Sequence, residues 1–314
     1  VESESSVEVF QPGDGEDGEV LPARRVRLPG PAAIANEPAL ARALRPFRQT
    51  RPSIRRRVLD VEATAEATAT AHCLAPVLVP AEERRFSLDI VVDTAPSMAV
   101  WRPAIADLTR LIEQQVGAFS RVTVWQMEMG DDGIRLRDSA GAVRSAAHVQ
   151  PADGRSIVLV ATDMVGARWR EDAPWRCLRT WAASAPVAIL DPLPVKLWRH
   201  TAVGPDRVVA HAGSAATANA RLRFALPRRL RLARRLRDDP VPFPVIGLHP
   251  RAFDAWTGLV VHASEPGCVA LLHVPGARTV EEADERGPVD DETRVRMVTQ
   301  LATPFALRLA TLAA

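Results

Sequence analysis

The sequence of 314 residues contains no tyrosine, three cysteines and a single lysine, Lys196. The cysteines are far apart and form no Cys-x-x-Cys pair or Cys/His cluster, so they indicate neither a disulfide framework nor a zinc site. No run of about 18 apolar residues occurs, and no membrane span or membrane partner is expected. The N-terminus is acidic and polar and is not a signal peptide, so we expect a cytoplasmic protein.

Sequence patterns typical of enzymes are also missing. The chain has no Gly-x-Ser-x-Gly element and no Walker motif, and its seven histidines are scattered without metal-ligand spacing. The net charge of +2 argues against a dedicated nucleic-acid binder. We therefore expect a protein that is not an enzyme and whose partner is not a nucleic acid.

Apolar runs that alternate with helical patterns organise the middle of the chain. Near-continuous apolar runs are typical of strands covered on both faces, as in a parallel sheet. Alternating strands and helices predict an α/β fold with a doubly wound, mostly parallel sheet. The predicted strands are Phe86–Val92, Arg121–Met127, an edge strand at Ile134–Leu136, Ser156–Ala161, Val187–Leu190 and Cys268–Val274. The predicted helices are Ala99–Phe119, Pro174–Ser184 and Pro250–Ala263.

Four regions follow from composition. Residues 1–20 read as a disordered tail, and residues 21–85 as an N-terminal extension that packs on the core. The extension includes predicted short helices at Ala39–Arg45 and Asp60–Ala71. Residues 86–278 form the α/β domain. Residues 279–314 form an acidic linker and a C-terminal helix that lead to a following module.

Two predicted strands end in acidic residues, Asp93 and Asp163. Ligands of open parallel sheets bind outside the carboxyl ends of the strands, so these two side chains are expected to lie close together. Ser97 follows Asp93 on the turn into the next helix. Two carboxylates and a hydroxyl suit a hard divalent cation. We expect no cofactor other than a weakly bound Mg²⁺. The alternative role is structural, with the carboxylates capping the helices that follow.

The segment from Asp93 to Met98 resembles the metal-ion-dependent adhesion motif of von Willebrand factor A domains, Asp-x-Ser-x-Ser. The segment from Ala161 to Asp163 resembles the later Thr/Ser-Asp-Gly element. By position, Asp93, Ser97 and Asp163 match the metal-arranging residues of that family. Ala95 replaces the first serine and has no ligand oxygen, and Met164 replaces the glycine. The resemblance therefore implies a von Willebrand A-like domain with a degenerate metal site.

Further segments resemble the N-terminal region of large multidomain proteins from high-GC bacteria. These segments are Ala39–Pro46, Leu59–Thr64, Pro76–Arg84 and Ser97–Trp101. The resemblance implies association with ATPases of the AAA+ or related NTPase classes and with bacterial conflict systems.

The leading hypothesis is a non-catalytic protein-interaction or scaffold module whose partner is a protein such as an NTPase. Trp101 is the expected interface anchor, because large amphipathic rings anchor many interfaces; its alternative role is packing against residues 73–80. The expected partner-binding residues are Ser97, Trp101, Asp163, Arg228 and Arg229.

Two other functions stay open. A nucleic-acid sensor would use the basic runs Arg55–Arg57 and Arg228–Arg237. A metal-dependent hydrolase would use Asp93 and Asp163, but the sequence offers no motif for a positioned base or water.

Overall fold

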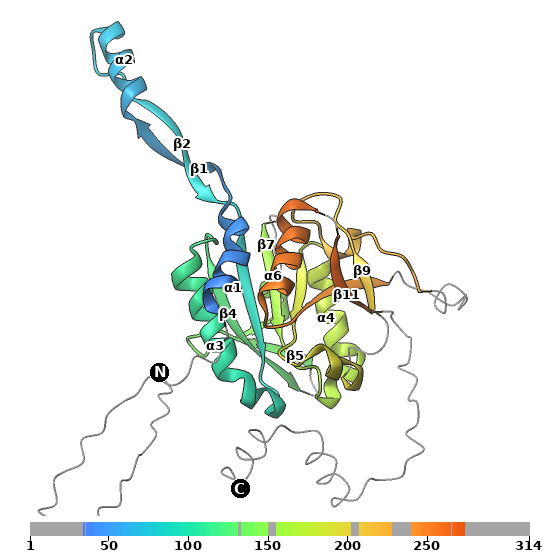
Figure 1. The fold of residues 1–314 in the computed structure, drawn as a ribbon. Helices are drawn as coiled ribbons and strands as arrows, with labels where there is room; N and C mark the ends of the chain where they lie inside the picture. Colours follow the sequence, from blue (N-terminus) through green and yellow to red (C-terminus); the bar gives the residue numbers. More distant parts are fainter. Residues whose placement is uncertain are drawn as a thin grey trace, which may run out of the picture. The chain divides into compact units, whose positions relative to one another are not determined.

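A nine-stranded sheet forms the centre of the computed structural model (Figure 1). The structure describes residues 34, 36–130, 133–149, 155–201, 207–227, 240–264 and 266–273. The chain divides into two units, Val1–Pro275 and Gly276–Ala314, and every described residue belongs to the first. The predicted tail, the basic run Arg228–Arg237 with Arg228 and Arg229, and the C-terminal linker and helix lie outside the described residues.

Five parallel strands occupy the middle of the sheet, in the order β4-β3-β7-β8-β10. Their bounds are β3 (Ser87–Asp93), β4 (Val122–Gly130), β7 (Ser156–Ala161), β8 (Val187–Leu190) and β10 (Val241–Ile246). Every residue of β7, β8 and β10 is buried, as expected for parallel strands covered on both faces. The prediction of an α/β protein with a central parallel sheet is confirmed.

Antiparallel strands extend the sheet on both sides, so the whole sheet is mixed. One side carries β5 (Gly133–Arg137) and β6 (Val143–Ser145), and the other carries β11 (Cys268–His273) and β9 (Arg207–Ala210). The prediction of an edge strand at Ile134–Leu136 is wrong in one respect. This strand is β5, and β6 pairs with its outer side and forms the edge.

Helices cover both faces of the sheet. Side chains of β3 and β7 alternate between two apolar cores, as the two-residue period of a strand requires. One core contains α1 (Glu37–Leu44), α3 (Arg102–Arg110) and α6 (Pro250–Thr257), and the other contains α4 (Asp172–Ala182).

The predicted helix at Ala99–Phe119 is confirmed as three consecutive helical pieces. A 3-10 turn, η2 (Pro96–Trp101), precedes α3, and a π-helical turn, η3 (Leu111–Val116), follows it. In the same way, the π turn η8 (Gly258–His262) extends α6. Short 3-10 turns occupy several connections: η1 (Arg45–Arg48), η4 (Ala146–Val149), η5 (Ala167–Arg170), η6 (Val195–His200) and η7 (Asn219–Arg221).

Residues 50–84 form an arm that is separate from the large sheet (Figure 1). Strands β1 (Thr50–Asp60) and β2 (Val77–Arg84) pair only with each other in the described structure, and α2 (Val61–Ala71) connects them. The predicted helix at Asp60–Ala71 is confirmed, with Asp60 as its N-cap: its carboxylate accepts from the Ala63 N–H at 3.0 Å. Sequence patterns did not reveal the two strands.

The arm corrects the expectation that residues 21–85 pack on the core as a whole. Ile34, α1 and Phe47 are part of the main apolar core. In contrast, α2 has no buried residue, and most of β1 is exposed. Among the described residues, no helix has the length and apolarity to cross a bilayer.

Phe47 tests how firmly the segment before the arm belongs to the core. Its ring is fully buried, with centroids of Phe119 and Trp256 at 5.1 Å and of Phe86 at 5.8 Å. We expect Phe47→Ala to lower the free energy of unfolding by about 3 to 5 kcal/mol, because it leaves a cavity among these rings. The exposed change Val143→Ala should cost less than about 0.5 kcal/mol. Denaturant titration measures both, and equal small losses would show that Phe47 is peripheral.

Candidate functional site

Three acidic residues lie at the carboxyl edge of three adjacent strands. Asp93 ends β3, Asp163 follows β7 by two residues, and Asp191 follows β8 directly. All three are buried. Because β3, β7 and β8 are parallel neighbours, their carboxyl ends meet at one edge of the sheet.

This edge contains the topological switch point of the sheet. β3 is the first strand of the parallel set along the chain; β4 lies on one side of it, and β7, β8 and β10 lie on the other. Connections therefore leave in opposite directions from β3 and from β7. In open α/β sheets such a point is where ligands bind.

Protein hydrogen-bond donors surround the carboxylate of Asp93. Its Oδ1 accepts from the Ala95 N–H at 2.9 Å. Its Oδ2 accepts from the Thr162 hydroxyl at 2.7 Å and from the Trp169 indole N–H at 2.8 Å. Hydrogen bonds to an ionised acceptor are stronger than neutral ones, so Asp93 joins β3, the end of β7 and the η5 turn.

Asp163 organises the second loop of the edge. Its Oδ1 accepts from the Ser97 hydroxyl and from the Val165 N–H, both at 3.1 Å. The Asp163 N–H lies 3.2 Å from the Met98 sulfur. The structure thus brings Ser97 and Asp163 together as the sequence pattern predicts, and links the loops that follow β3 and β7.

Asp191 is a site residue that the sequence reasoning missed. Its Oδ1 accepts from the Leu193 N–H at 2.9 Å, while its buried Oδ2 has no partner within the described structure. Burial raises the pKa of Asp191 to about 7, and the negative charge of Asp163 acts in the same direction. An acid directly after a buried strand was the available signal, since the same signal identified Asp93.

The site residues do not fit a Mg²⁺ ion as they are arranged. Ala95 stands where the motif of von Willebrand A domains has a serine oxygen. Around Asp93, one hydroxyl and two N–H groups direct their hydrogens at the carboxylate, and a cation approaching it would meet these positive ends. Within the described ranges, no group of three or more His, Cys, Asp or Glu side chains could hold a metal ion.

The side chain of Trp101, the expected interface anchor, is only partly exposed at this edge. It ends η2, and its ring is partly buried against the core that contains α3. The neighbouring Val100 is 77% exposed and presents the larger apolar surface. Residues 73–80, the alternative packing partner of Trp101, belong to the arm and its β2 strand.

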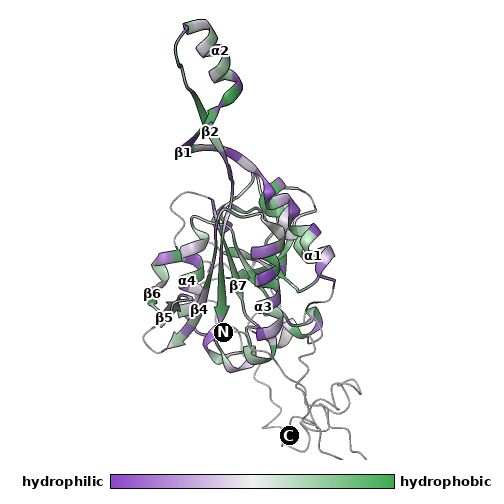
Figure 2. Cartoon of the chain, turned by 90° about the vertical axis from the view of Figure 1, so that its left-hand side faces the viewer, coloured by the Kyte–Doolittle hydropathy of each residue, from purple (hydrophilic) through white to green (hydrophobic). Residues whose placement is uncertain are grey.

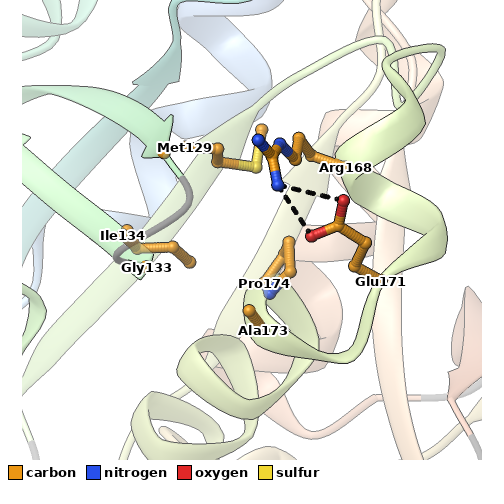
Figure 3. Close-up of a pocket in the computed structure, with 8 residues that line it drawn as sticks. Met129, Gly133, Ile134, Arg168, Glu171, Ala173 and Pro174 are labelled. Carbon is orange, nitrogen blue, oxygen red and sulfur yellow. Dashed lines mark hydrogen bonds and ion pairs between the residues drawn. The ribbon is translucent and has the colours of Figure 1, made fainter.

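A small hollow beside the site lies between the end of β4 and the start of α4 (Figure 3). Arg168 and Glu171 form an ion pair at 3.2 Å across its rim, near Met129, Ile134 and Pro174. Its volume is about 10 Å³, which is room for a single water molecule. This hollow is too small for an organic substrate.

A larger depression of about 350 Å³ lies at the opposite, amino end of the sheet. Its lining includes Ser184, Ala218 and Arg221. The neighbouring Asn219 bonds to both Val187, the first residue of β8, and Pro242 near the start of β10. The depression is therefore remote from the three acids.

No protein-family model matches the chain, and no match was found among curated proteins or solved structures.

The buried carboxyl of Asp191 predicts a specific pH dependence of stability. Its pKa is about 7 in the folded protein against an ordinary value of 3.8, so between these pH values the folded state holds a proton that the unfolded state has lost. This contribution makes the free energy of unfolding fall as pH rises through that window. We compare the free energy of unfolding of Asp191→Asn with that of wild type. The difference, variant minus wild type, should be about 2 to 3 kcal/mol more positive at about pH 8 than at about pH 5. Denaturant titrations at both pH values measure it, and an advantage that does not change with pH would contradict the assignment.

Proposed function

We propose that this chain is a non-catalytic protein-binding module, and that its partner binds at the carboxyl edge of the sheet. Exposed apolar side chains on three loops of this edge support the proposal most directly. Val100 follows β3, Val165 follows β7 and Val195 follows β8, and each is about half exposed or more. Loops held by buried carboxylates present these side chains on a fixed frame, which reduces the entropy lost on binding.

A doubly wound von Willebrand A-like arrangement is the finer form of this proposal. The order of the five parallel strands and the acids at the ends of β3 and β7 support it. Met164 adds a backbone argument, because it has a φ of 51° at the position where the resembled motif has glycine. This left-handed region favours glycine, so the loop keeps a glycine-type backbone with a different side chain.

The contacts of the polar residues favour binding over catalysis. Ser97 donates its hydroxyl to the carboxylate of Asp163 and not to an imidazole, the stronger base that activates serine in Ser-His pairs. Asp93 has its oxygens engaged by Ala95, Thr162 and Trp169. A metal-dependent hydrolase would need ligand and base positions that these contacts already use.

The partner that we propose is a protein of the AAA+ or related NTPase classes, within a bacterial conflict or signalling system. This part of the proposal depends on the resemblance of Ala39–Pro46 and Pro76–Arg84 to multidomain bacterial proteins. Nucleic acid is the alternative partner, and one observation favours it: Arg55, Arg56 and Arg57 are all exposed.

Substitution of the exposed valines tests the binding edge. We expect Val100→Asp combined with Val165→Asp to reduce capture of the NTPase from a cell extract at least about tenfold, because charges replace apolar contacts. Val209→Asp, at an exposed valine of the edge strand β9, is the matched control and should capture as wild type does.

Quantitative mass spectrometry of the captured proteins, after nuclease treatment, provides the readout. Capture should persist from about 0.15 M to about 0.5 M salt, whereas phosphate contacts weaken steeply over this range. Equal capture by wild type, the double valine variant and Val209→Asp would contradict the proposal that the partner binds at the carboxyl edge. Loss of capture on nuclease treatment would favour the nucleic-acid alternative.

A further inference from the structure

The arm exposes apolar side chains on both of its faces. Leu59 and Leu78 face each other across the ribbon and are 51% and 50% exposed, and the next pair along is Val58 and Val79. At its two ends, Ile54 and Leu74 are each 80% exposed. Figure 2 shows the hydrophobic stretches (green) along the two strands and α2.

Such a ribbon lacks most of what usually stabilises a strand pair. A two-stranded hairpin is marginally stable in water unless a third strand or a packed layer covers it. Both strands of the arm have an outer edge that pairs with no described strand, and unpaired edges readily accept another chain. The arm therefore has the properties of a surface that is covered when the protein is assembled.

Charges divide the arm into two halves of opposite sign. From residue 54 to 59 the charged residues are Arg55, Arg56 and Arg57, a formal charge of +3. From residue 60 to 76 they are Asp60, Glu62 and Glu66, a formal charge of −3 with His72 neutral. Residues 77 to 81 of β2 are uncharged, and the charges of Arg51, Glu82, Glu83 and Arg84 at the root cancel. The arm is basic near its root and acidic near its tip.

Contacts at the root fix the arm to the body of the protein. Glu83 pairs with Arg51 of the opposite strand and lies 3.6 Å from Arg155, which directly precedes β7. A hydrogen bond from Ser53, followed by the neighbouring arginines, holds the pKa of Glu83 below its usual value. The pairing of β1 with β2 shifts register between Pro52 and Arg57, and in this bulge Ser53 accepts from the N–H groups of Arg55 and Arg56.

We propose that the arm binds the arm of a second copy of this chain, with the two arms antiparallel about a two-fold axis. Isologous interfaces need a self-complementary surface. In an antiparallel pair the basic half of each arm lies against the acidic half of the other. The same arrangement covers the exposed apolar residues on the face of each arm that meets the other arm. A nucleic-acid partner would match the arginines but would be repelled by the acidic half.

Reciprocal charge reversal tests the proposal on the full chain. The first variant carries Arg55→Glu, Arg56→Glu and Arg57→Glu. The second carries Glu62→Arg and Glu66→Arg, and leaves Asp60 in place because it caps α2. Sedimentation equilibrium should show a dimer for wild type. Each variant alone should have a dissociation constant raised at least about tenfold, because like charges then face each other.

An equimolar mixture of the two variants should restore a dimer, detected as a heterodimer with two fluorescent labels. This restoration requires both variants to be folded. The matched control reverses three exposed arginines outside the arm, Arg170→Glu, Arg207→Glu and Arg251→Glu, and should dimerise as wild type does. A wild type that stays monomeric at about 100 μM, or reversed variants that dimerise unchanged, would overturn the proposal. So would a monomeric wild type that loses binding to a short DNA or RNA duplex on reversal of the arginines.

Discussion

The carboxylate of Asp93 and its three donors hold the loops at the carboxyl edge of the sheet in place. Ala95 belongs to the loop after β3, Thr162 to the end of β7, and Trp169 to the turn before α4. A buried carboxylate without such partners would carry a large desolvation penalty, so the three donors stabilise the positions of these loops. The same loops, after β3 and β7, place Ser97 beside Asp163 and expose Val100 and Val165.

The body of the protein buries apolar side chains, whereas the arm, residues 50–84, exposes them. The nine-stranded sheet buries it on both faces, beneath α1, α3 and α6 on one side and α4 on the other. The arm leaves it in water along two strands and a helix. The contrast between a well-packed body and an exposed apolar arm supports the proposed pairing of two arms. The carboxyl edge and the arm are therefore the two separate surfaces at which we propose that partners bind.

Sequence patterns predicted the sheet well because buried parallel strands are marked by uninterrupted apolar residues, as in Ser156–Ala161. They also predicted that Asp93, Ser97 and Asp163 lie at one site, because the carboxyl ends of neighbouring parallel strands lie at the same edge of the sheet. Trp169 escaped prediction because its hydrogen bond to Asp93 joins residues 76 positions apart, and nothing local marks it. The strands of the arm escaped because neither face is buried, so Arg-rich β1 lacks the apolar alternation that marks a strand.

We infer that protein donors, rather than a metal ion, satisfy the carboxylate of Asp93. The most direct test measures the free energy of unfolding with and without about 10 mM Mg²⁺ or Mn²⁺. A ligand that binds the folded state raises this free energy by RT ln(1 + [L]/Kd). We predict no change in this free energy beyond the effect of ionic strength. An increase of about 5 kcal/mol, as binding with a micromolar Kd would give, would contradict it.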